Sequence, residues 1–149
     1  SAPGERTNVA PISMEAIDPK ERPVQSLDWG VLKWLVTPDD IPDAKVTFGE
    51  VLLLPGKGHD RHNHPESEEI LYVLSGEGNQ MLDDGGESWF PVGAGDTIYV
   101  PQAMFHAMIN TGWQPLRLLA IYNPGGAERV LRDLPGFREG DGPEWTVGG

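Results

Sequence analysis

Cysteine is absent from this chain of 149 residues. Its absence excludes disulfides, thiolate nucleophiles and cysteine-based zinc sites, so any metal must be held by nitrogen and oxygen. A chain without cysteine fits a reducing compartment, and the polar N-terminus "SAPGERTN" lacks the apolar core of a secretory signal. We therefore expect a cytoplasmic location.

Long apolar runs and positive charge are also scarce. The longest apolar runs, at 51–54 and 116–122, are strand-sized and fall well short of the roughly 20 residues that span a bilayer. The chain has 11 Lys and Arg but 23 Asp and Glu, so its formal charge is −12. A protein that binds nucleic acids or anionic membranes needs a positively charged surface. We therefore expect neither as a partner, and take the acidity to serve solubility.

Glycine and proline, by contrast, are plentiful, with 19 and 14 residues, and they separate short β-type runs. These runs lie at 30–37, 45–54, 69–76, 78–82, 96–100, 105–110 and 116–122. Short strands broken by turn residues predict an all-β antiparallel sandwich or barrel. The segment "DDGGES" at 83–88 predicts a tight turn, because Asp-Gly and Gly-Gly tolerate positive φ.

The chain is short enough to predict one folded domain with two distinct ends. We expect an N-terminal arm at 1–26, the β-domain at 27–123, and a short helix with a loose tail at 124–149. In "AERVLRDL" (127–134) the residues Val130, Leu131 and Leu134 share one face of an α-helix, which either closes the barrel or only packs against it.

We also expect a homodimer. The proline-rich arm lies over the barrel or over a partner subunit. Together with the following "LDWGVLKW" (27–34) it could add a strand to the sheet edge of a neighbour.

Histidine is rare but clustered, since three of the four histidines fall within "GHDRHNHPESEE" at 58–69. In an extended strand, His62 and His64 point to the same face about 6.6 Å apart, close enough for both rings to bind one ion at about 2.1 Å. His59 has the opposite parity, so we expect it in the preceding loop, either solvated or acting as a mobile acid or base. Alone, the cluster is weak evidence for a metal site, because histidine is often simply a polar surface residue.

Two further residues can complete a metal site. A short turn after "PESE" would bring Glu69 back beside the histidine pair on an antiparallel strand. The fourth histidine, His106, lies in the distant β-type run 105–110 and could supply another imidazole. The spacing therefore makes a mixed nitrogen and oxygen site possible.

The order of these residues resembles the paired signature motifs of the cupins. The two segments are Gly56-x5-His62-x-His64-x4-Glu69-x6-Gly76 and Gly95-x5-Pro101-x-Ala103-x2-His106-x3-Asn110. The second motif usually has glycine where this chain has Ala103. Because alanine tolerates positive φ poorly, we expect an ordinary backbone conformation there.

The resemblance implies a double-stranded β-helix, or jelly roll, with one divalent metal ion near its mouth. The ligands implied are His62, His64, Glu69 and His106, which leave one to three coordination positions open for water or substrate. Such a set suits Fe, Mn, Ni, Co or Zn.

The pattern also predicts the surroundings of the metal. Leu71 and Val73 share the parity of Glu69, as Met108 and Asn110 share that of His106, so a largely apolar interior is expected. Four aromatic residues are expected in core or interface positions, namely Trp89, Tyr99, Trp113 and Tyr122.

Fold and metal leave three functions open. The favoured one is a metal-dependent oxidoreductase of dioxygenase type acting on a small oxygen-bearing organic substrate, since an apolar lining offers few acid or base groups. The second is a non-redox isomerase, epimerase or lyase, which requires a separate base, and His59 is the remaining histidine. The third is a cupin that binds a small ligand without catalysis.

Overall fold

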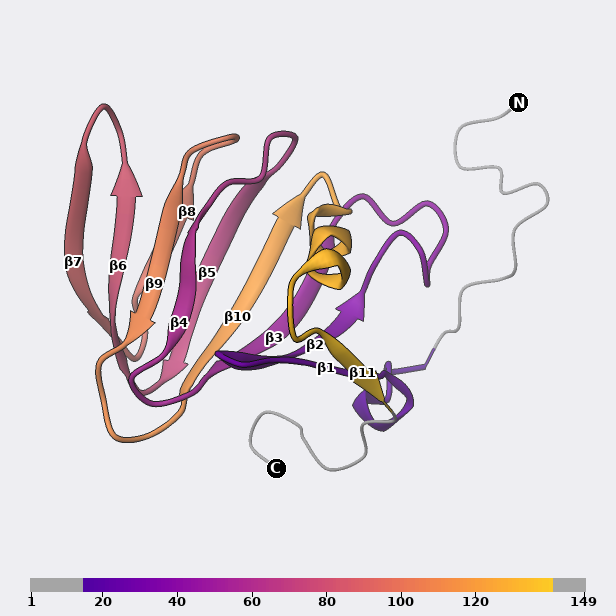
Figure 1. Cartoon of the computed structure of the whole chain (residues 1–149). Coiled ribbons are helices and arrows are strands. Elements are labelled where there is room, and N and C mark those ends of the chain that lie inside the picture. Colours follow the sequence, from indigo (N-terminus) through magenta and orange to yellow (C-terminus); the bar gives the residue numbers. More distant parts are fainter. Residues whose placement is uncertain (1–14, 141–149) are drawn as a thin grey trace.

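The computed structural model describes residues 15–140, which form two facing antiparallel sheets (Figure 1). The seven-stranded sheet has the order β11-β1-β2-β3-β10-β5-β8, and the four-stranded sheet has the order β4-β9-β6-β7. The predicted all-β jelly roll is confirmed.

The strand bounds follow the chain. They are β1 Val24–Leu27, β2 Gly30–Val36, β3 Thr47–Leu53, β4 Gly58–His62, β5 Glu68–Ser75, β6 Glu77–Asp83, β7 Glu87–Gly93, β8 Thr97–Val100, β9 His106–Asn110, β10 Leu116–Asn123 and β11 Arg138–Gly140. Two 3-10 helices complete the described elements, η1 at Pro19–Glu21 and η2 at Ala127–Asp133. No helix among residues 15–140 has the length and apolar character that crossing a bilayer requires.

Each of the seven predicted β-type runs corresponds to a strand. The seven runs did not include β1, β4, β7 and β11, although the metal-site argument assumed an extended strand at His62. β4 is polar, β7 is mostly exposed and β11 has three exposed residues, so none of these three shows the apolar alternation of a half-buried strand. The predicted turn is confirmed, because β6 and β7 pair from Asp83 opposite Glu87, and Gly85 has φ 71°.

The core lies between the sheets and follows the predicted parity. Along β10, the buried residues Leu116, Leu118, Ala120 and Tyr122 alternate with partly exposed ones. Burying a leucine side chain of this kind contributes about 1.5–3 kcal/mol relative to leaving it in water. This alternation holds the sheets together and leaves polar inward-facing positions for the site.

The two ends differ from the expectations. Residue 26, where the arm was expected to end, lies within β1, and β1 pairs with β2 on one side and β11 on the other. The segment 27–34 therefore has no free strand edge to offer a partner. Residues 1–14 of the predicted arm and 141–149 of the predicted tail lie outside the described part of the chain.

The C-terminal helix is a 3-10 helix rather than an α-helix. With three residues per turn, Glu128, Leu131 and Leu134 align, while Val130 points away and is 56% exposed. The predicted common face of Val130, Leu131 and Leu134 is therefore wrong, although Leu131 does pack into the barrel.

The prediction for Ala103 is also wrong, because its φ is 66°. Hydrogen bonds hold this turn between β8 and β9: the Ala103 amide donates to the His64 carbonyl at 3.0 Å, and Asn63 Nδ2 donates to the Ala103 carbonyl at 3.1 Å. The chain thus keeps the left-handed conformation that the usual glycine would adopt more easily.

Ala103→Gly should raise the free energy of unfolding by about 1 kcal/mol, because glycine relieves the left-handed strain. Urea denaturation followed by circular dichroism measures this change in the free energy of unfolding. The matched control is Ala94→Gly, since Ala94 is an exposed turn alanine without positive φ. That control should not stabilise the protein, and equal effects at both positions would contradict the strain.

Candidate metal centre

Three imidazoles converge inside one end of the barrel. His62 ends β4, His64 follows two residues later, and His106 begins β9. His62 and His106 face each other in the antiparallel register of β4 and β9. One ring nitrogen from each of the three histidines lies within 4.8 Å of those of the other two. The structure therefore brings together the three histidines expected from the motifs.

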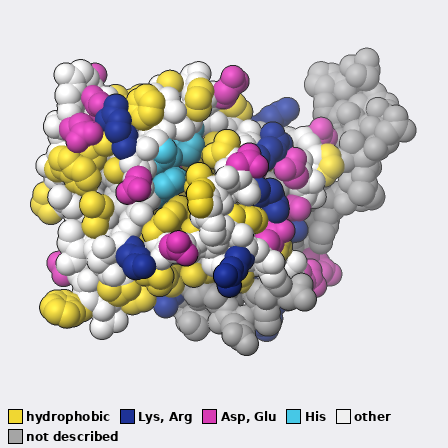
Figure 2. All heavy atoms as spheres, in the orientation of Figure 1, with side chains coloured by type: hydrophobic (Ala, Val, Ile, Leu, Met, Phe, Trp, Pro, Cys, Tyr) yellow, Lys and Arg dark blue, Asp and Glu magenta, His cyan; other side chains and the backbone are white. Residues whose placement is uncertain are grey.

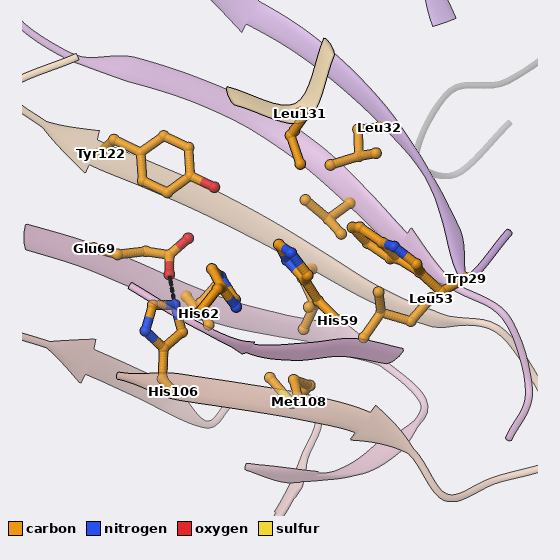
Figure 3. A pocket seen from close by; sticks show the side chains of 13 residues that line it. Trp29, Leu32, Leu53, His59, His62, Glu69, His106, Met108, Tyr122 and Leu131 are labelled. Carbon is orange, nitrogen blue, oxygen red and sulfur yellow. Dashed lines mark ion pairs between the residues drawn. The ribbon is translucent and has the colours of Figure 1, made fainter. Parts of the chain in front are cut away.

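Glu69 reaches the same point from the opposite sheet. Its Oε1 lies 3.0 Å from His106 Nε2 (Figure 3). The same oxygen lies 3.7 Å from His64 Nε2. The expected hairpin return is wrong, because β4 pairs with β9 whereas β5 pairs with β10 and β8. The carboxylate is thus beside the histidines across the barrel interior rather than along one sheet.

Backbone carbonyls set the tautomers of two rings. His62 Nδ1 lies 2.7 Å from the Asp60 carbonyl oxygen, and His106 Nδ1 lies 2.9 Å from that of Met104. A carbonyl oxygen only accepts, so each Nδ1 carries the ring proton and each Nε2 presents a lone pair. Histidines that bind metals show this arrangement.

The Nε2 lone pair of His106 lies against another hydrogen-bond acceptor, the Oε1 of Glu69. Its Nε2 is buried and makes no hydrogen bond within residues 15–140, and His64 Nε2 is in the same state. A neutral ring nitrogen and a carboxylate oxygen are both acceptors, so at 3.0 Å they require a proton or a cation between them. Three nitrogens and a carboxylate oxygen fit a divalent transition metal.

The charges of the site suit a cation at neutral pH. Burial lowers the pKa of His62 to about 2, with a smaller contribution from the neighbouring His59. Burial raises the pKa of Glu69, but the imidazoles of His106 and His64 outweigh it and bring the pKa to about 2. His62 is therefore neutral and Glu69 ionised, which are the states that bind metals.

His59 lies in the site and not in a solvated loop, so that expectation is wrong. It belongs to β4, where the pairing with β9 is irregular between His59 and His62. This irregularity cancels the parity difference and turns both rings to the same side. His59 stacks between Trp29, at 4.4 Å between ring centroids, and His62, at 3.6 Å.

Comparison with known proteins agrees with this geometry. Residues 49–122 match the Cupin domain family. An uncharacterized protein of Methanocaldococcus jannaschii, MJ1618, is 33% identical over 105 residues, which cover 70% of this chain and 82% of that protein. The chain belongs to the cupin family.

Other relatives of this cupin are longer proteins. A glucose-6-phosphate isomerase of Thermococcus kodakarensis is 35% identical over 91 residues, which cover 54% of this chain and 48% of that protein. A structure of Bacillus subtilis oxalate decarboxylase, studied for its Mn(II) centres, has a TM-score of 0.62 and 27% identity over 74% of this chain and 31% of its own. The chain thus spans about half or less of these two proteins.

Three histidines of this cupin, His59, His62 and His106, line a small apolar pocket. Its volume is about 50 Å³, and its lining includes Trp29, Leu53, Leu71, Met108 and Leu131 beside the histidines. Figure 2 shows the histidine side chains reaching the surface among hydrophobic ones. The predicted apolar lining is confirmed.

Several lining residues had not been predicted for the site, among them Tyr122, Trp29 and Leu131. Tyr122 is buried with its hydroxyl turned toward Glu69 (Figure 3), and burial, followed by the Glu69 charge, raises its pKa well above the usual value. The alternation along β10 would have placed Tyr122 inside. Trp29 and Leu131 lie outside the regular strands at the pocket, so no periodicity predicted their position.

His106→Ala should lower divalent metal affinity by at least tenfold, because second-shell changes alone cost about 10–100-fold and a ligand contributes more. Calorimetric titration of the metal-free chain with Zn²⁺ and Mn²⁺ measures the loss. Ile109→Ala on the exposed side of β9 is the control and should keep wild-type affinity. Unchanged affinity in His106→Ala would remove this residue from the set.

The metal-free protein should lose stability as pH falls from about 6.5. Burial lowers the folded-state pKa of His59 to about 4, so below pH 6.5 the unfolded chain binds protons that the folded chain excludes. The slope reaches about 1.4 kcal/mol per pH unit for each such histidine, while Glu69 contributes only below pH 4.5.

Urea denaturation in EDTA between pH 7.5 and 5 tests this dependence. His59→Phe keeps an aromatic ring between Trp29 and His62 but cannot titrate, so its stability should vary less with pH. A stability that stays constant in the wild type over this range would contradict the burial of neutral histidines.

Proposed function

We propose that this cupin is a metal-dependent enzyme acting on a small oxygen-bearing organic substrate, with His62, His64, Glu69 and His106 as the metal ligands. The observation that carries the proposal is the contact of Glu69 with the unprotonated Nε2 of His106 at the inner end of an apolar pocket. A divalent ion held there, whether Fe, Mn, Ni, Co or Zn, would supply open coordination positions for oxygen atoms of substrate or for dioxygen.

Dioxygenase-type chemistry remains the first candidate. Beyond the proposed ligands, the described lining of the pocket holds two titratable side chains, His59 and Tyr122. The high pKa of Tyr122 keeps its hydroxyl protonated, so it acts as a hydrogen-bond donor rather than as a base. A pocket with so few acid and base groups leaves the chemistry to the bound ion.

A non-redox reaction is the second candidate, and the position of His59 favours it. Its ring lines the pocket and stays neutral because burial lowers its pKa to about 4. A neutral imidazole at that place can accept a proton from a substrate bound beside His62. The similarity to proteins named glucose-6-phosphate isomerase and oxalate decarboxylase supports isomerase, epimerase or lyase chemistry.

A third candidate is a cupin that binds a small ligand without turnover in the same pocket. The homodimer and the cytoplasmic location remain predictions.

The experiment compares the metal-loaded chain in air and under nitrogen, with a panel of small hydroxy acids, keto acids and diketones. Under the first candidate, oxygen uptake follows the metal content and is abolished by His106→Ala. Turnover under nitrogen with Zn²⁺ or Mn²⁺ would instead support the second candidate, and saturable binding without turnover in either gas the third.

His59→Phe separates the two catalytic candidates. If His59 is the base, the substitution should lower kcat by about 10²–10⁴-fold, the usual contribution of a general base. If the bound ion carries the chemistry, kcat should change only a few-fold. Metal content measured on the same samples ensures that the comparison is between equally loaded proteins.

A further inference from the structure

A second cavity, of about 80 Å³, lies beside the 3-10 helix η2. Glu128 of this helix lines the second cavity, and Leu131 of the same helix lines the histidine pocket. Trp34 also lines the second cavity and packs against Tyr122 of the histidine pocket at 5.5 Å between ring centroids. The two cavities are thus neighbours, but they share no lining residue.

Glu128 is a buried carboxylate, and only one of its two oxygens has hydrogen-bond partners among the described residues. It is 5% exposed, and its Oε1 accepts hydrogen bonds from the Thr47 hydroxyl and, at 3.0 Å, from the Gly126 amide. Its Oε2 is buried and has no hydrogen-bond partner within the described residues. A buried charged oxygen without a donor is costly, so this atom calls for a ligand that supplies one.

The charges around Glu128 favour a positive ligand. The lining holds four carboxylates and two guanidinium groups. Arg129 binds Asp39 with two hydrogen bonds at 2.9 and 3.1 Å, and Arg132 binds Glu139 with two at 2.8 and 3.1 Å. Each guanidinium is therefore matched by its own carboxylate, and Asp40 lies 3.9 Å from Arg22, which leaves Glu128 as the one lining carboxylate without an ion pair among the described residues.

The arrangement also indicates which cation fits. Within residues 15–140, the histidine cluster is the one group that brings three metal-binding atoms within 4.8 Å of one another, so these carboxylates do not converge as a metal ion requires. An ammonium group has three N–H donors and requires no fixed coordination geometry, so it can donate one hydrogen bond to a single buried acceptor. Trp34 also lines the cavity, its Nε1 donates a hydrogen bond to Gln25 Oε1, and an indole ring attracts cations.

We propose that this cavity binds the ammonium group of a small primary amine, which donates a hydrogen bond to Glu128 Oε2 and lies beside Trp34.

The test uses the full metal-free chain and ethylammonium chloride, with sodium chloride at the same ionic strength as the reference. Among the indole N–H signals of the five tryptophans, that of Trp34, assigned with Trp34→Phe, should shift saturably with ethylammonium but not with sodium. Glu128→Gln should weaken binding at least tenfold, because it replaces the acceptor with a donor of similar shape.

Asp133→Asn is the matched control, since it removes one negative charge from an exposed position on the same helix, and it should bind like the wild type. Equal affinity in Glu128→Gln, or an equal shift with sodium, would overturn the proposal.

A crystal structure of the wild type grown in ethylammonium does not depend on how the variants fold. It should show the amine at Glu128 Oε2, and a water molecule alone at that atom would overturn the proposal. The wild-type titration and the crystal structure measure amine binding at Glu128 without changing the histidine pocket, so their failure would leave the proposed metal-dependent function standing.

Discussion

The contact between Glu69 and the imidazoles of His106 and His64 joins the two sheets of the barrel at its polar end. Glu69 is 4% exposed and ionised, and a buried carboxylate is stable only when opposite charge or donors surround it. The Nε2 of His106 on the other sheet is itself an acceptor, so a proton or a cation between it and Glu69 must hold the two sheets close at this point. The apolar alternation of β10 beside it keeps the surroundings dry, which strengthens each electrostatic contact.

The C-terminal segment has two functions in this architecture. Its 3-10 helix η2 is fixed by Glu128, whose carboxylate binds the Thr47 hydroxyl on β3. The same helix places Leu131 over the histidine pocket. A polar anchor on one cavity thus holds an apolar wall of the other, and the position of this wall sets the size of the pocket beside His59 and Tyr122.

Several sequence-based predictions failed for one shared reason. Parity arguments assume regular strands, and the irregular pairing between His59 and His62 breaks that assumption, so His59 faces the pocket. The usual preference of alanine placed Ala103 in an ordinary conformation, but hydrogen bonds with Asn63 and His64 hold it at positive φ. In both cases contacts between distant segments outweigh the local preference of the chain.

The sequence by itself determined the all-β class, most of the strands and the three histidines that converge, because alternation and motif spacing are local properties. Only the tertiary structure decided which sheet supplies Glu69, where Trp29 and Tyr122 lie, and that Glu128 has an unmatched oxygen. These features depend on how strands far apart in the chain pair and face each other. That arrangement is set by packing of the whole barrel, which no short stretch of sequence contains.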